Sequence, residues 1–147
     1  GKYIAPQVIE NAMKQSVFID QIMVIGENQK FPAALIQLNF EEIEAWAKEK
    51  QITIDTNPAL WCENIKVQNK IMNEVNNINE NFGQWEKIKD MRLTPDVWSV
   101  DDGHLTPTMK LKRKIVREKY NLLIENIYTA KKYYARTVFF CMFDMCK

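Results

Sequence analysis

Two apolar runs joined by a short polar turn constrain the fold of this chain more than any other feature. The runs are Phe18–Ile25 and Phe31–Leu38, and the polar residues Gly26–Gln29 lie between them. Short apolar runs that are rich in Ile, Val and Leu and bounded by turn residues are typical of buried strands. The short connection predicts an antiparallel β-hairpin at this position.

Helical periodicity surrounds this hairpin on both sides. Apolar residues recur at helical spacing over Pro6–Gln15 and Phe40–Lys50, over a longer stretch that opens at Asn57-Pro58, and over Lys110–Tyr128. Asn39 is a suitable N-cap for the second helix, and Gly83 is well placed to end the third. A further strand is predicted at Trp85–Leu93, with a short extended piece at Val97–Val100. The pattern predicts an α+β domain, in which a small sheet including a β-hairpin is packed with helices.

Composition excludes several classes of protein and site. The chain has 147 residues, a net charge of +1 and 46% hydrophobic residues, which suits one domain with its own core. Its four glycines are too far apart for a phosphate-binding loop, and its single histidine excludes the HExxH zinc motif. Three cysteines without a CxxC pair indicate reduced thiols, so no metal site is predicted. Because we find no signal peptide and no apolar segment of about 20 residues, we expect a cytoplasmic protein without a transmembrane segment.

The near-neutral balance hides a local excess of positive charge. Six cations and one acid lie between Lys110 and Lys119, so this stretch carries +5. Cations at the start of a helix oppose its dipole, which indicates an anionic ligand such as phosphate, although a solvated basic face is the alternative. The preceding Thr106-Pro107-Thr108 predicts a rigid loop that presents Lys110, with Thr108 as a helix cap.

Two segments carry a resemblance to a known family. Gly1–Glu10 (GKYIAPQVIE) resembles the motif that opens the C-terminal domain of adenylate-forming enzymes, and Leu105–Lys114 (LTPTMKLKRK) resembles their late motif. Met109 stands where most of these enzymes have glycine, a departure usual in the long-chain fatty acid–CoA ligase branch. Trp85–Lys89 also fits the spacing of the family. The resemblance covers Gly1–Tyr128 and is specific because both motifs occur in order.

The resemblance implies the fold of the family's mobile lid and a two-step ligation, in which a fatty acid and ATP give acyl-AMP and coenzyme A then displaces AMP. It implies that Lys110 is the catalytic lysine of the first step, on a loop formed with Thr106 and Thr108. The second step would pass the pantetheine thiol along Gly1, Lys2, Tyr3, Ile4, Ala5 and Pro6. ATP, coenzyme A and Mg²⁺ would be bound mainly by an N-terminal adenylation domain, the expected partner of this one. Because the chain begins within a motif, we expect a piece of a larger enzyme that is inactive alone.

Other interpretations of the same residues stay open. A non-catalytic anion-binding or protein-interaction module could be built on the basic helix and an apolar tail. Nucleic acid is disfavoured because no aromatic residue interrupts the basic stretch. We divide the chain into residues 1–128, the lid domain, and 129–147, an apolar tail that could pack, contact a partner or be foreign to the natural protein. Peripheral contact of the enzyme with a membrane also stays open. His104 is interpreted as a surface residue, and the four tryptophans are interpreted as core: Trp46, Trp61, Trp85 and Trp98.

Overall fold

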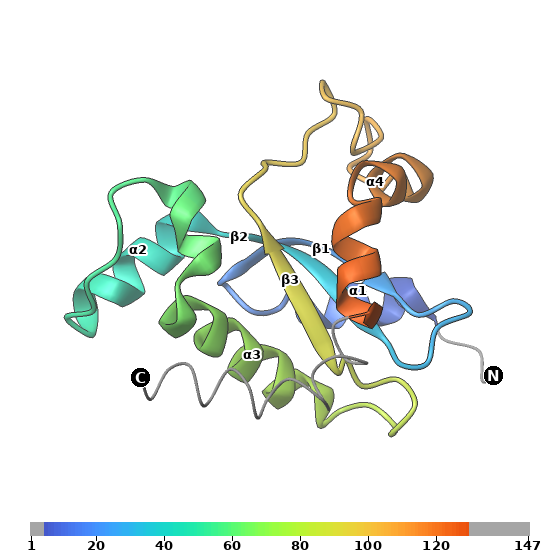
Figure 1. Cartoon of the computed structure of the whole chain (residues 1–147), viewed down its shortest axis with the longest axis horizontal. Coiled ribbons are helices and arrows are strands. Elements are labelled where there is room, and N and C mark those ends of the chain that lie inside the picture. Colours follow the sequence, from blue (N-terminus) through green and yellow to red (C-terminus); the bar gives the residue numbers. More distant parts are fainter. Residues whose placement is uncertain (1–4, 130–147) are drawn as a thin grey trace.

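The structure is a computed structural model that describes residues 5–129. Three strands and the helices between them follow one another along the chain (Figure 1). The elements, in order, are α1 (Pro6–Met13), β1 (Ile19–Ile25), β2 (Ala33–Leu38), α2 (Phe40–Glu49), the 3₁₀ helix η1 (Pro58–Glu63), α3 (Ile65–Asn79), β3 (Asp90–Thr94) and α4 (Arg113–Lys119). A further helical segment occupies residues 121–129 after a turn at Tyr120. The predicted α+β class is confirmed.

The sheet is mixed, and its central strand is the second one. β1 and β2 form the predicted antiparallel hairpin, and β3 lies parallel to β2 on its other side. All six residues of β2 are buried, because helices or loops cover both faces of the sheet. This double coverage explains why the strand is a nearly continuous apolar run and not an alternating one.

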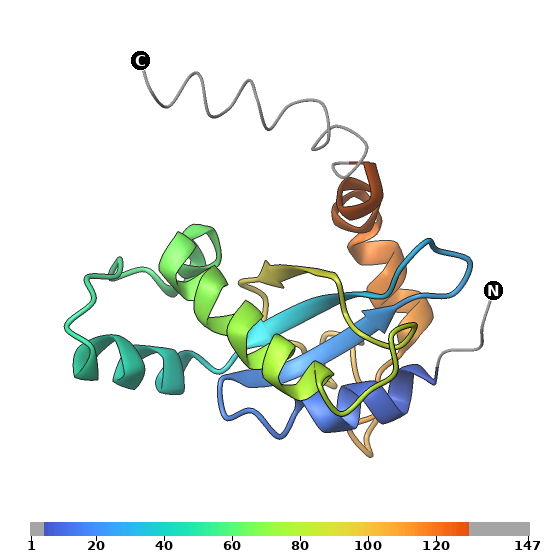
Figure 2. The same ribbon diagram turned by 90° about the horizontal axis from the view of Figure 1, so that it is seen from below.

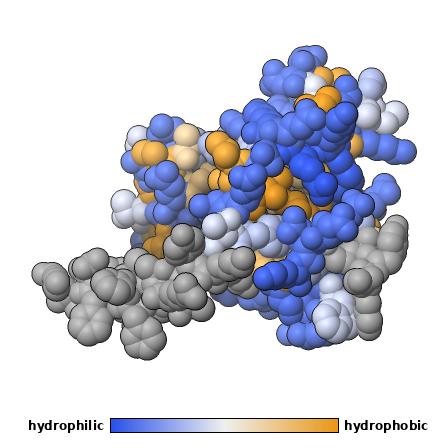
Figure 3. Space-filling model, turned by 45° about the vertical axis from the view of Figure 1, so that its right-hand side comes forward, coloured by the Kyte–Doolittle hydropathy of each residue, from blue (hydrophilic) through white to orange (hydrophobic). Residues whose placement is uncertain are grey.

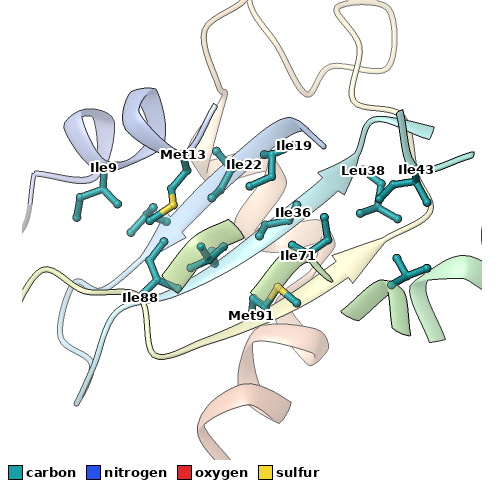
Figure 4. Close-up of a cluster of buried hydrophobic side chains, with 14 of the residues drawn as sticks. Ile9, Met13, Ile19, Ile22, Ile36, Leu38, Ile43, Ile71, Ile88 and Met91 are labelled. Carbon is teal, nitrogen blue, oxygen red and sulfur yellow. The ribbon is translucent and has the colours of Figure 1, made fainter. Parts of the chain in front are cut away.

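Each face of the sheet has its own apolar core. On one face, side chains from α1, α2 and α3 pack against the strands, as the labelled residues of Figure 4 show. Ile9 and Met13 of α1 and Ile71 of α3 are fully buried in this core. On the other face, Trp98, Leu105 and the α4 region cover the sheet. Figure 2 shows α3 and α4 lying apart, with the sheet between them. α1 and α4 therefore belong to different layers of the molecule.

The predicted helix starts and ends differ from the observed ones in informative places. Asn39 caps α2 as expected, since its side chain accepts a hydrogen bond from the Glu42 N–H. The stretch after Asn57 does not form one helix: η1 comes first, and Asn64 then caps α3 with bonds to two backbone N–H groups. α3 ends at Asn79, so Gly83 does not terminate it. The side chain of Asn79 instead bonds both backbone groups of Ile88 and turns the chain toward β3.

Two predicted extended segments also need correction. The strand expected at Trp85–Leu93 forms only from Asp90, because residues 84–87 make a turn after α3. Trp85 lies in that turn and is 61% exposed, whereas Trp61 and Trp98 are core residues as predicted. Residues 97–100 form no strand; the Trp98 N–H donates to the side chain of Gln37 and not to a strand backbone.

The surface of this domain is largely hydrophilic, with apolar areas between the charged side chains (Figure 3). Residues 5–129 contain no helix with the length and apolar character that a bilayer span requires. Residues 130–147, most of the predicted apolar tail, lie outside the described residues.

Tyr128 connects the helical segment 121–129 to the β-hairpin. Its hydroxyl donates to the carbonyl oxygens of Phe31 and Ile25, at 2.9 and 3.3 Å, at the two ends of the β1–β2 turn. Burial raises the pKa of Tyr128 to about 12, and the nearby Asp90 adds to the effect.

Replacing Tyr128 by Phe is expected to lower the free energy of unfolding by about 1 kcal/mol at pH 7, through the lost hydrogen bonds. The raised pKa leads to a second prediction. Between about pH 10 and pH 12 the unfolded tyrosine ionises and the folded one does not, so this group favours unfolding as pH rises. Urea denaturation at pH 7 and above pH 10 should therefore show a smaller alkaline loss in Tyr128→Phe. An equal loss in both proteins would contradict the prediction.

Candidate functional site

Lys110 lies in a tight hairpin formed by residues 105–111, which we call the Lys110 hairpin. Leu105 and Leu111 pair as an antiparallel bridge at its base. Thr106 closes the loop: its N–H donates to the Lys110 carbonyl at 2.7 Å, and its Oγ1 accepts the Lys110 N–H at 3.0 Å. The long loop that carries the hairpin rises at the top of Figure 1. The backbone of Lys110 is thus fixed by Thr106.

The side chain of Lys110 is exposed, and its ammonium group has no hydrogen-bond or ion-pair partner within residues 5–129. A cation on a fixed backbone with a free side chain can reach an anion as a point charge. The arrangement suits a phosphate or carboxylate oxygen supplied from outside this domain.

Thr108 does not cap a helix, contrary to the sequence prediction. Its hydroxyl lies 3.1 Å from that of Thr106, inside the hairpin. α4 begins only at Arg113, with Lys112 at the N-cap position and no side-chain cap. The predicted helix start at Lys110 is wrong because the Leu105–Leu111 bridge keeps residues up to Leu111 in the hairpin. Lys110 therefore does not oppose a helix dipole as the sequence suggested.

Met109 adopts a backbone conformation that L-residues other than glycine rarely use. Its φ is +66°, and its side chain is 56% exposed. A non-glycine residue in the left-handed region costs about 1–2 kcal/mol. This position is the one where the resembling family usually has glycine, so the observed backbone gives a physical reason for that preference.

Replacing Met109 by Gly is expected to raise the free energy of unfolding by about 0.5–1 kcal/mol, because relief of the strain outweighs the greater freedom of the unfolded chain. Met109→Val is the matched control, because a β-branched residue tolerates this φ less well and should destabilise the domain. Urea denaturation of the two variants checks the prediction. Stabilisation by valine, or destabilisation by glycine, would contradict it.

Arg113 and Glu10 join the late motif to the opening motif. The Arg113 guanidinium forms an ion pair with Glu10 Oε1, and Glu10 Oε2 accepts the Val24 N–H at 2.7 Å. Glu10 is only 5% exposed, because it shares the buried face of α1 with Ile9 and Met13. Val24 belongs to the edge strand β1, whose outward N–H groups have no strand partner. The Glu10 carboxylate thus connects α1, the sheet edge and α4.

A cleft of about 260 Å³ lies between α1 and the Lys110 hairpin. Lys14, Lys110 and Arg113 bring positive charge to its lining, and Glu10 brings the negative charge. Gln7, Asn11 and Gln21 add amide groups. The structure therefore brings part of both motifs to one polar cleft.

The sequence-predicted site residues are only partly described. Ala5 precedes α1 at its N-cap and Pro6 is its first residue, which is the position where proline suits a helix. Gly1, Lys2, Tyr3 and Ile4 lie outside the described residues. Sequence reasoning missed Glu10 and Arg113. An acid beside the apolar residues of α1 was a usable signal for Glu10, whereas Arg113 could not be distinguished from the neighbouring cations.

His104 is buried and only 3% exposed, so its interpretation as a surface residue is wrong. The Ser99 N–H donates to its Nδ1 at 3.3 Å, and Lys119 Nζ lies 3.0 Å from its Nε2. Lys119 also pairs with Asp96 at 3.5 Å. A hydrogen bond from the Tyr120 hydroxyl lowers the pKa of Asp96, and the charge of Lys119 lowers it further. The acidic turn at Asp101-Asp102 suggested exposure, but the ring turns inward to these partners.

Comparisons with known proteins show the family of this chain. The family model described as the AMP-binding enzyme C-terminal domain matches residues 1–132. The chain is 33% identical over 135 residues to long-chain fatty acid–CoA ligase 1 of Cavia porcellus, which covers 90% of this chain and 19% of that protein. It is 34% identical to a long-chain fatty acid–CoA ligase of Mycobacterium tuberculosis, covering 87% of this chain and 21% of that one. The chain thus spans about a fifth of the length of these relatives.

Solved structures give the same fold. The adenylation domain of a carboxylate reductase from Mycobacterium chelonae superposes with a TM-score of 0.70 at 20% identity, over 88% of this chain and 18% of that one. The corresponding domain from Segniliparus rugosus, solved with AMP and a co-purified carboxylic acid, gives 0.71 at 20% identity, over 88% of this chain and 19% of that one. With the family match over nearly the whole chain, these likenesses show that this protein belongs to the family of AMP-binding enzyme C-terminal domains.

Proposed function

We propose that this chain is the C-terminal lid domain of an AMP-forming long-chain fatty acid–CoA ligase. The observation that carries the proposal is Lys110, a free cation on a rigid hairpin within the late motif. The guinea-pig and mycobacterial relatives are long-chain fatty acid–CoA ligases, and they match this chain over about nine-tenths of its length. The partner of the domain would be its own N-terminal adenylation domain, which would hold the fatty acid.

The first reaction joins two negatively charged groups. The fatty-acid carboxylate attacks the α-phosphorus of ATP, the bond to the β-phosphate oxygen breaks, and acyl-AMP and pyrophosphate result. Lys110 would stabilise the charge that develops between the carboxylate and the phosphate oxygens. The closed lid would also keep water from hydrolysing the mixed anhydride.

The second reaction needs Lys110 to withdraw. The thiol of coenzyme A attacks the acyl carbonyl, and AMP leaves with the bonding electron pair. We propose that residues 1–6 line the path of the pantetheine, as the resemblance implies, with Ala5 and Pro6 placing this segment at the start of α1. Gly1 would let the backbone pass close to the ligand, since glycine has no Cβ.

ATP and coenzyme A are the proposed substrates, with Mg²⁺ as the proposed cofactor. Within the described part of the chain, no three His, Cys, Asp or Glu side chains gather as a metal site. The residues present do not fit Mg²⁺, so we assign its binding to the N-terminal domain. The free Lys110 and the cations of the cleft fit phosphate groups better.

We further propose that the enzyme acts in fatty-acid metabolism in the cytoplasm, with contact to membrane surfaces as an alternative location. An anion-binding or protein-interaction module is the second candidate function, but the family match does not favour it. A titration with RNA at low salt tests the anion-binding form of this module, since a nucleic-acid binder would bind with strong salt dependence. Sedimentation of the chain at several concentrations tests the protein-interaction form.

Enzyme activity distinguishes the proposed function from the second candidate function. The full-length enzyme should form acyl-CoA from oleate, ATP and coenzyme A, whereas the 147-residue chain alone should form none. The reason is that no phosphate-binding loop occurs in this sequence, and its glycines cannot supply one. Mass spectrometry of acyl-CoA products is the measurement. Turnover by the isolated chain, or none by the full-length protein, would contradict the proposal.

A further inference from the structure

A partly buried polar network lies beneath the base of the Lys110 hairpin, and none of its residues lines the cleft. It consists of His104, Lys119, Asp96, Tyr120 and Trp98, and we call it the His104 network. The Trp98 indole N–H donates to the Tyr120 hydroxyl at 3.0 Å, and that hydroxyl donates to Asp96 at 2.7 Å. Asp96 in turn pairs with Lys119, which lies beside the His104 ring.

The network is anchored to the sheet. Gln37 is 2% exposed, a polar residue inside the otherwise apolar strand β2. Its Oε1 accepts the Trp98 N–H at 2.8 Å, and its Nε2 donates to Asp20 of β1 at 2.7 Å. Buried polar groups are expensive unless they are paired, and satisfied networks of this kind fix one arrangement of the core. The network therefore has a rigid support below it.

The upper end of the network is the backbone that carries the hairpin. The His104 carbonyl accepts the Lys112 N–H at 2.9 Å, just outside the Leu105–Leu111 bridge. Ser99 bonds His104 twice, through its N–H to the ring and through its carbonyl to the His104 N–H at 3.0 Å. His104 and Leu105 are buried, whereas residues 107–110 are all exposed. The base of the hairpin is thus buried and bonded to the network, whereas its outer residues are exposed.

We propose that His104 is a positioning residue for Lys110: it links the sheet-anchored network to the hairpin base and so fixes where the lysine is presented. This proposal rests on the proposed function, because the consequence of misplacement is a slower adenylation step. A reacting group displaced by about 1 Å can cost 10²-fold in rate, even when the altered residue is remote from the chemistry. Thioesterification does not use Lys110 and should be spared.

His104→Leu in the full-length enzyme removes both ring contacts and keeps an apolar volume. Asn79→Leu is the matched control, because Asn79 is also buried and also makes two hydrogen bonds, at 2.9 and 3.0 Å to Ile88, but on the opposite face of the sheet. Both variants should be compared at a temperature where melting curves show them folded. His104→Leu should lower kcat for acyl-AMP formation about 10-fold or more. The rate at which His104→Leu converts supplied acyl-AMP to acyl-CoA should stay within about twofold of wild type. In Asn79→Leu, the rates of both reactions should stay within the same limit.

Lys119→Met tests the same contact by changing the residue beside the His104 ring. It removes the ammonium group beside the His104 ring and keeps most of the apolar stem. We expect a smaller loss of adenylation with the same selectivity, because Ser99 still holds the ring. Three outcomes would overturn the proposal. His104→Leu could keep adenylation within twofold of wild type, it could lose both reactions equally, or Asn79→Leu could lose as much adenylation as His104→Leu.

Amide hydrogen exchange tests the positioning without any catalysis. The Lys110 and Lys112 N–H groups, bonded to Thr106 and His104, should exchange faster in His104→Leu and not in Asn79→Leu. Unchanged exchange would overturn the role of His104. Lys110→Ala in the same assays separates the two claims: if it does not slow adenylation, the proposed function fails, while the exchange result still decides whether His104 holds the hairpin.

Discussion

Lys110→Ala is expected to slow acyl-AMP formation in the full-length enzyme by about 10² to 10³-fold, the typical cost of losing one preorganised charge-stabilising group. The physical reason is that the carboxylate and the triphosphate repel each other, and Lys110 is the free cation that the hairpin presents. Pyrophosphate release measured without coenzyme A reports this step alone.

Lys114→Ala is the matched control for this prediction. It removes the same charge from the same basic stretch, but from an exposed position on α4 and not from the hairpin. Adenylation should change little in this variant. Equal losses in the two variants would mean that the summed charge of the stretch acts, and not the placement of Lys110.

Glu10→Ala is expected to lower the free energy of unfolding by about 3 kcal/mol, a large loss for a single substitution. The change leaves the buried Val24 N–H without its acceptor and removes the partner of Arg113. The Arg113 side chain is 41% exposed, so water can solvate part of its freed charge and the loss stays below that of a fully buried pair.

Glu10→Gln provides the comparison, since its amide oxygen can still accept the Val24 N–H while the negative charge is gone. We expect a loss of about 1–2 kcal/mol for this variant. Urea denaturation of the 147-residue chain measures both values. If alanine and glutamine cost the same small amount, the carboxylate does not connect α1 to the sheet edge as described.

Local sequence patterns predicted the helices and strands well where residues close in sequence determine the structure. The hairpin, the capping role of Asn39 and the proline start of α1 depend on residues near one another, so the sequence was sufficient. The prediction for the stretch after Asn57 was wrong because Asn64 offered a better cap seven residues later. The helix expected from Lys110 starts later because a single bridge, Leu105–Leu111, keeps the preceding residues in the hairpin.

Only the site residues that lie within the two motifs could be predicted from the sequence. Lys110 and Thr106 were found through the late motif, and the structure places both in one hairpin. The partners of Arg113 and His104 were not predictable, because Glu10 lies 103 residues from Arg113 and Lys119 lies 15 residues from His104. Such pairings depend on how the layers pack, and periodicity does not encode them. The strained backbone of Met109 could not be predicted, because methionine as a residue type does not suggest a positive φ.

The central claim is that Lys110 serves adenylation and not thioester formation, and one ratio tests it directly. In Lys110→Ala, the rate of acyl-CoA formation from supplied acyl-AMP should be compared with the rate of acyl-AMP formation from fatty acid and ATP. We predict that this ratio rises at least about 100-fold above wild type, because only the first reaction needs the cation. An unchanged ratio, with both half-reactions reduced equally, would contradict the claim.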